Sequence, residues 1–172
     1  MTHLIFDYRW AKEVARSASP ELQATWAVLS IRADSDSLLV AIDRETSDQR
    51  DWIVVPLYPI AEWIASSWWL LFENPRALSK KPRDHRSLRS CGDGFLWPDL
   101  SFKSLGDAIE IRASSTSAGE NEYISFRAHD PVWVDSGEVR LRFTELVEAV
   151  LRRLAEAGVT NTPLHEIGRA HV

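Results

Sequence analysis

The chain has 172 residues, of which 45% are hydrophobic and 26% are charged, and its formal net charge is −5. These values predict one globular domain with a sizeable core and exclude wholesale disorder. We expect a cytoplasmic protein without a membrane helix, because the apolar run Ile60–Phe72 is short and carries Glu62, and the single Cys91 excludes an internal disulfide.

The first 55 residues contain four stretches with the alternation or β-branched content of strands: Met1–Trp10, Thr25–Arg32, Leu38–Asp43 and Trp52–Val55. In the first of them, Leu4, Phe6 and Tyr8 fall on one side. An Asp/Ser-rich turn separates the second stretch from the third and predicts a hairpin. The last three stretches together predict a three-stranded antiparallel meander.

A tryptophan-rich helix is predicted over about 59–72. Pro59 suits the first turn, where the missing N–H has no intrahelical partner. Apolar residues then recur at helical spacing from Ile60 to Leu71 and predict a stripe that faces a core. Trp69 falls roughly opposite Ile60, so the helix is apolar on two sides. This pattern fits a helix sandwiched within the chain or one that meets a partner.

The second half of the chain predicts a long loop over 73–89, because Pro75 and Pro82 interrupt it and no period is present. Three further strands are predicted: Asp99–Lys103, Ala108–Ala113 and Tyr123–Ala128. A long helix follows over about 137–157. Asp135 has the spacing of a helix cap, and Gly158 fits the C-terminal cap.

These elements predict an α+β domain over residues 1–158, with an antiparallel sheet of about six strands packed by the two helices. Residues 159–166 predict a linker to a missing region. Residues Ile167–Val172 resemble the translation of a sequencing-adapter string, which encodes Ile-Gly-Arg-Ala-His-Val before a stop. We therefore expect 167–172 to be a non-native tail and the natural reading frame to continue beyond Glu166.

Eight tryptophans are unusual for this length: Trp10, Trp26, Trp52, Trp63, Trp68, Trp69, Trp97 and Trp133. We interpret most of them as core residues, and the alternative is an aromatic binding surface. The candidate binding residues are Glu62, Trp63, Trp68, Trp69 and Trp97. Trp69 is the best candidate for exposure. Glu62 either stabilises the helix N-terminus or forms a functional buried carboxylate.

A basic segment stands out in this acidic chain. Its candidate phosphate-binding residues are Arg76, Lys80, Lys81, Arg83, Arg86 and Arg89. Such a loop fits contacts to nucleic-acid phosphates, with Trp97 stacking on a base. The alternative is a solvated loop whose cations pair with surface acids.

The residues indicate no catalytic or metal site. The five histidines lack paired ligand spacing, and His165-Glu166 begins a zinc-peptidase pattern in which Arg169 occupies the place of the second histidine. Glycine-rich phosphate loops and nucleophile motifs are absent from the sequence. We expect no metal, no cofactor and no catalytic residue in this chain.

The most distinctive strings are Val55–Ile64, followed by Trp68 and Trp69, and the later Gly94–Leu100. They resemble a P-L-Y-P-x-A-E-W…W-W signature of uncharacterised bacterial proteins, over roughly residues 55–158. The resemblance implies an N-terminal fragment of a longer protein, with regulatory or peptidase-like domains downstream in some members. It assigns no catalytic residue to this segment.

We therefore expect a non-catalytic sensing or interaction module, the N-terminal part of a larger cytoplasmic bacterial regulatory or stress/phage-response protein. Its partner would be another protein or a downstream domain of its own full-length chain. Two alternatives stay open. One is a nucleic-acid-associated module that uses the basic loop 76–89, and the other is the N-terminal domain of an enzyme whose catalytic part is missing.

Overall fold

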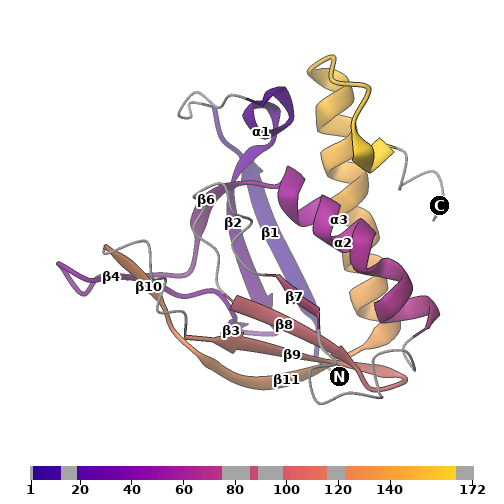
Figure 1. The fold of residues 1–172 in the computed structure, drawn as a ribbon. Coiled ribbons are helices and arrows are strands. Elements are labelled where there is room, and N and C mark those ends of the chain that lie inside the picture. The colour runs from indigo at the N-terminus through magenta and orange to yellow at the C-terminus, as the bar shows by residue number, and fades with distance from the viewer. Residues whose placement is uncertain (1, 13–18, 75–85, 89–98, 116–122, 166–172) are drawn as a thin grey trace.

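The computed structural model describes residues 2–12, 19–74, 86–88, 99–115 and 123–165. The elements in these ranges are β1 (Leu4–Trp10), α1 (Pro20–Ala24), β2 (Trp26–Ala33), β3 (Asp36–Ser37), β4 (Ala41–Asp43), β5 (Gln49–Arg50), β6 (Ile53–Pro56), α2 (Tyr58–Trp68), the π-helical turn η1 (Trp69–Glu73), β7 (Arg86–Leu88), β8 (Asp99–Ser104), β9 (Ala108–Ser114), β10 (Ile124–Phe126), β11 (His129–Asp135) and α3 (Ser136–Glu156). Antiparallel sheets packed by helices give the predicted α+β fold (Figure 1).

The first sheet is built around β2. This strand pairs with β1 along its whole length, and on its other side it pairs with β6 at its start and β3 at its end. Alternate residues from Ala27 to Ala33 are buried on one face. Among the described strands none pairs with the other side of β1, where a single bridge joins Thr2 to Val134. The strand β1 is therefore an edge strand.

Two more sheets contain the remaining strands, one in the order β11-β9-β8-β7 and the other in the order β10-β4-β5. The predicted single sheet of about six strands is thus divided. The predicted hairpin with β2 forms only in part: Asp36–Ser37 pairs with β2 and the Leu38 amide donates to the Ile31 carbonyl oxygen at 2.9 Å, whereas β4 pairs with β10. The reason is that Leu38 and Leu39 are successive residues and both are buried, which a strand with one solvated face does not allow.

The tryptophan-rich helix is confirmed as α2, and its last turn is the π-helical η1. Its predicted core stripe is also confirmed, since Ile60, Ile64, Ser67 and Leu71 are buried. The helix contacts α3, which runs alongside β1 (Figure 1). Among the described residues no helix is long and apolar enough to cross a membrane.

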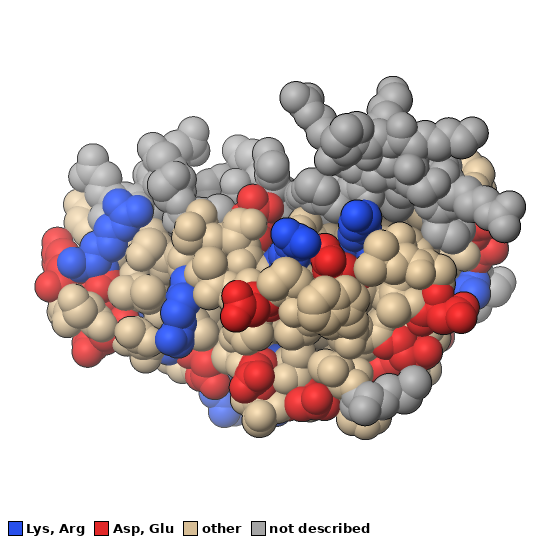
Figure 2. Space-filling view, turned by 90° about the horizontal axis from the view of Figure 1, so that it is seen from below, with Lys and Arg blue, Asp and Glu red and all other residues tan. Residues whose placement is uncertain are grey.

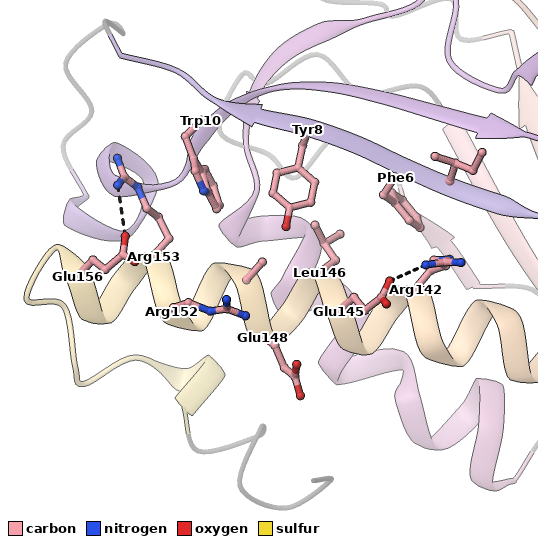
Figure 3. Close-up of a pocket in the computed structure, with 12 residues that line it drawn as sticks. Phe6, Tyr8, Trp10, Arg142, Glu145, Leu146, Glu148, Arg152, Arg153 and Glu156 are labelled. Atoms are coloured by element: carbon pink, nitrogen blue, oxygen red, sulfur yellow. Dashed lines mark hydrogen bonds and ion pairs between the residues drawn. The ribbon is translucent and has the colours of Figure 1, made fainter.

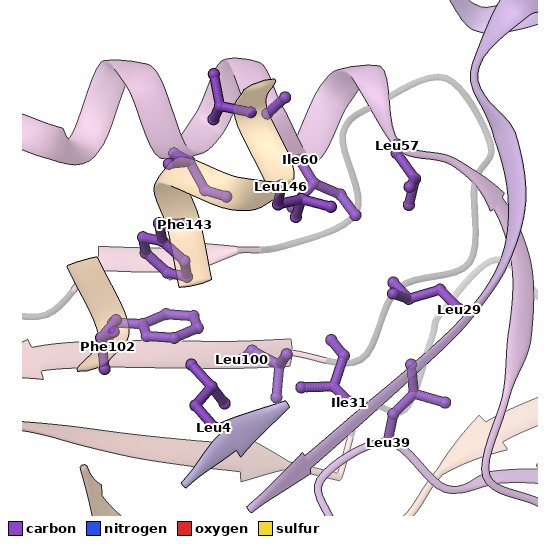
Figure 4. Packing of buried hydrophobic residues seen from close by; sticks show 14 of the residues in the cluster. Leu4, Leu29, Ile31, Leu39, Leu57, Ile60, Leu100, Phe102, Phe143 and Leu146 are labelled. Atoms are coloured by element: carbon purple, nitrogen blue, oxygen red, sulfur yellow. The ribbon is translucent and has the colours of Figure 1, made fainter. Parts of the chain in front are cut away.

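The elements meet at Phe143 of α3 (Figure 4). Its ring centroid lies 5.9 Å from that of Phe6, 6.1 Å from Trp63, 6.1 Å from Phe72 and 5.4 Å from Phe102. These distances are typical of edge-on and tilted aromatic packing. The sheet of β1 and β2, the sheet of β8 and β9, and the helices α2 and α3 therefore share one hydrophobic core.

Both predicted caps of α3 are confirmed. The Asp135 carboxylate accepts a hydrogen bond from the Glu138 amide at 3.0 Å, which satisfies one of the free N–H groups of the first turn. Gly158 has a φ of +76°, and the amides of Gly158 and Val159 bond back to Ala155 and Leu154. This pair of backbone hydrogen bonds ends many helices. It favours glycine because the residue just after the helix adopts a positive φ.

Further segments also differ from expectation. Arg86–Leu88 lies in the predicted loop but forms β7, which pairs with β8. In the predicted linker, Thr162 is 3% exposed and Leu164 is 0% exposed. The packed body of the chain therefore includes residues beyond 158.

Candidate interaction groove

A groove of about 690 Å³ lies between β1 and α3 (Figure 3). One wall consists of Phe6, Tyr8 and Trp10, which alternate along β1 and point toward the helix. Leu146 and Ala149 of α3 line the groove opposite them. All three aromatic side chains are half-buried, so the groove presents aromatic surface to solvent.

The aromatic wall is held at several points. Phe6 packs on Phe143 in the core, as described above, and the rings of Tyr8 and Trp10 meet edge-on at 5.4 Å. The guanidinium of Arg153 lies over the Trp10 ring at 5.6 Å, and its Nε donates to the carbonyl oxygen of Ala24 at 3.1 Å. The rings are therefore positioned before any ligand arrives.

The helix side of the groove carries six charged residues: Arg142, Glu145, Glu148, Arg152, Arg153 and Glu156. Arg142 is paired within the helix, to Glu138 at 3.0 Å and to Glu145 at 2.8 Å. Arg153 lies 3.5 Å from Glu156. No ion pair is recorded for Arg152 among the described residues.

The charged residues of the groove affect the pKa of Tyr8. Burial raises the pKa of its hydroxyl above the ordinary value of 10.0, Arg152 opposes that rise and Glu145 adds to it. Desolvation disfavours the tyrosinate anion, whereas a nearby cation stabilises it. Arg152 therefore contributes to the electrostatic environment of the Tyr8 hydroxyl.

The backbone of β1 contributes a second feature to the groove. The carbonyl oxygen of His3 accepts from the amide of Asp34 at 2.8 Å, and the amide of Ala11 donates to Trp26 at 2.9 Å. In an antiparallel ladder, alternate residues bond to the same neighbour. The odd-numbered residues of β1 therefore face β2, and the N–H and C=O groups of Phe6, Tyr8 and Trp10 point to the outer edge.

The structure separates the predicted binding residues on the helix. Trp68 is 8% exposed and Trp69 is 50% exposed. Trp63 is half-buried and packs at 5.2 Å against Phe102. Glu62 is half-buried and acts on the neighbouring Tyr58 hydroxyl, whose pKa is raised by burial first and by Glu62 second. Of the tryptophans in this group, Trp69 alone has a largely solvent-facing side chain.

The other predicted residues fall mainly outside the described part of the chain. These are Trp97, Arg76, Lys80, Lys81, Arg83 and Arg89. For Arg86 the structure gives only its backbone pairing in β7 with Phe102. On the face of the molecule in Figure 2, the described basic side chains are interspersed with acidic ones.

The described residues contain no group of three or more His, Cys, Asp or Glu side chains that could hold a metal ion. A second hollow of about 600 Å³ lies on the first sheet and includes Asp7, Arg32 and Trp52. Its lining comes from strands and from the segment before β6, so it lacks the helical wall that α3 gives the groove.

The sequence signal for the groove was present but incomplete. Alternation along Met1–Trp10 predicts that Phe6 and Tyr8 share one face of a strand. It does not reveal whether that strand lies at the edge of a sheet. The facing residues of α3 are more than 130 positions away in the chain. Comparisons with protein-family models, curated proteins and solved structures found no match to this chain.

Proposed function

We propose that this chain is a non-catalytic interaction module that holds a protein partner in the groove between β1 and α3. The observation that carries the proposal is the aromatic wall of Phe6, Tyr8 and Trp10, which lies beside an edge of β1 that no strand in the described part of the chain pairs with. Clustered, pre-positioned aromatic side chains are typical of binding hot spots, because they bury a large area with little loss of side-chain entropy.

We also propose the larger protein to which this module belongs. The module would act as the N-terminal part of a larger cytoplasmic bacterial regulatory or stress/phage-response protein, and its partner would be a separate protein or a downstream domain. Trp69 is a candidate for an additional contact, because its ring is half exposed. Trp68 would support that contact from the core.

The alternatives rest on residues that the structure does not describe. A nucleic-acid-associated module would depend on the basic loop 76–89, and an enzyme would depend on a region after residue 166. Both stay predictions. For the first, binding that falls steeply as salt rises would be the signature of phosphate contacts.

Site-specific photocrosslinking tests the proposed function. A p-benzoylphenylalanine is placed at Ala149 in the groove and, as a matched control, at Val54, which is 42% exposed on β6. The full chain is irradiated in an extract of cells that carry the natural gene. We expect an adduct from position 149 that position 54 does not give.

The captured protein is then identified and purified, and its affinity is measured by calorimetry. We expect Trp10→Ala to weaken its binding at least about tenfold, the loss typical of a hot-spot aromatic residue. Thermal unfolding checks that the variant is folded. Equal yields of adduct at both positions, or an affinity that Trp10→Ala leaves unchanged, would contradict the proposal.

A further inference from the structure

We propose that the groove binds an extended, acidic peptide segment of the partner, which adds to the first sheet as a strand beside β1. Apolar side chains of the segment would pack on Phe6, Tyr8 and Trp10, and a carboxylate would reach Arg152. The inference rests on the proposed function and gives the chemistry of its ligand.

The edge of β1 is suited to strand addition. It pairs with β2 in continuous register over seven residues, without a bulge, and its sequence contains neither proline nor lysine. Bulges, prolines and inward-pointing charges are among the means by which proteins prevent an edge from pairing. The charged Asp7 and Arg9 of β1 lie on the face opposite Phe6, Tyr8 and Trp10 and leave the groove side free of charge on this strand. The outward N–H and C=O groups of Phe6, Tyr8 and Trp10 therefore offer a regular hydrogen-bonding row.

The same three residues supply both the hydrogen bonds and the aromatic wall. An added antiparallel strand pairs its residues with them, and alternate side chains of that strand then point into the groove. An extended peptide that adds to a strand edge gains affinity from main-chain bonds and specificity from alternate side chains. The 690 Å³ groove provides the space for those side chains.

A second copy of this chain is a less suitable occupant. Paired strands lie about 4.8 Å apart, whereas packed helices need about 8–10 Å between their axes. In each copy α3 runs directly against its own β1, through Phe143 and Phe6 among others. Antiparallel pairing of two β1 edges would place both α3 helices on the same face, only about one strand spacing apart. A single extended segment avoids that clash.

The ion pairs within the groove indicate the charge of the ligand. Arg142 and Arg153 have carboxylate partners on α3, as described above, and Arg152 has none recorded among the described residues. Figure 3 shows that Glu148 points away from β1, while Arg152 acts on the Tyr8 hydroxyl. The cation available to a bound segment is therefore Arg152, and its complement is an Asp or Glu side chain.

Selection from a phage-displayed library of random 12-residue peptides identifies the preferred sequence. We expect apolar residues at every second position with an Asp or Glu among them. The synthetic consensus peptide then binds the full chain, and Arg152→Glu weakens that binding at least about tenfold. Replacing the acidic residue of the peptide by Lys restores affinity to Arg152→Glu. The matched control, Arg44→Glu, reverses an exposed charge outside the groove and leaves affinity unchanged.

Strand pairing is tested separately by two comparisons. Tyr8→Pro and Tyr8→Ala both remove the ring, but only proline removes the outward N–H, so we expect the proline variant to bind about tenfold more weakly than the alanine variant. If Tyr8→Pro does not fold, N-methylation of the peptide gives the same information. Methyl groups at every second amide would abolish binding, and those between them would be tolerated.

A consensus with helical spacing, a consensus without an acidic residue, or equal effects at successive amides would overturn this inference. So would a failure to select any peptide. If photocrosslinking at Ala149 still captures a partner in those cases, the proposed function stands and only the strand-addition mode fails. If both experiments fail, the groove is not the binding site.

Discussion

Trp68 and Trp69 are successive residues with opposite environments. Trp68 packs on Phe72 at 4.8 Å and under the Arg140 guanidinium at 5.4 Å, whereas Trp69 is 50% exposed. We predict that Trp68→Ala lowers the free energy of unfolding by about 3 kcal/mol and that Trp69→Ala lowers it by less than about 1 kcal/mol. Urea unfolding followed by circular dichroism measures both values, and equal losses would contradict the assignment of Trp68 alone to the core.

The ionisation of Tyr8 tests the electrostatics of the groove. Arg152 favours the tyrosinate and Glu145 disfavours it, so Arg152→Ala should raise the pKa of Tyr8 further and Glu145→Ala should lower it. Because burial already raises this pKa, the unfolded chain loses its proton first. The contribution of Tyr8 to stability is therefore complete below a pH of about 10 and falls as the pH rises through the folded pKa.

NMR of a chain labelled at the tyrosine ζ carbon measures these pKa values, and Tyr8→Phe assigns the signal. A Tyr8 pKa that is unchanged by Arg152→Ala would show that the two side chains do not share the groove. In that case Arg152 would not face the groove, and the inference that the ligand carries a carboxylate would fail.

At the scale of elements, the start of α3 depends on one side chain. Asp135 caps the helix through the Glu138 amide. We predict that Asp135→Ala lowers the free energy of unfolding by about 1 kcal/mol, whereas Asp135→Asn, which keeps an acceptor oxygen, retains most of the stability. Thermal and urea unfolding of both variants check the difference. Similar losses in the two variants would assign the effect to charge rather than to the hydrogen bond.

The elements themselves were largely predictable from local pattern. β1, β2, α2 and α3 all follow from alternation, helical spacing and capping residues, because these signals depend on neighbours in the chain. Pairing was less predictable. The stretch Leu38–Asp43 has strand-like composition, yet it leaves β2 because both Leu38 and Leu39 are buried, and β6 takes the place beside β2.

At the scale of the whole molecule, the candidate site joins residues from the two ends of the chain. Most tryptophans were predicted to lie in the core, with Trp69 the best candidate for exposure. Trp68 is buried and Trp69 is 50% exposed, but Trp52 and Trp133 are also exposed, at 40% and 54%. The groove depends instead on β1 being an edge strand and on α3 lying beside it. Both conditions arise from long-range packing around Phe143, which no local pattern encodes.

Amide hydrogen exchange along β1, read residue by residue by NMR with and without the selected peptide, tests the central claim most directly. The amides of Ile5, Asp7 and Arg9 face β2 and should exchange slowly in both states. Those of Phe6, Tyr8 and Trp10 should exchange rapidly in the free chain and slowly in the complex. Protection of these three amides in the free chain, or rapid exchange that persists with the peptide bound, would contradict the account.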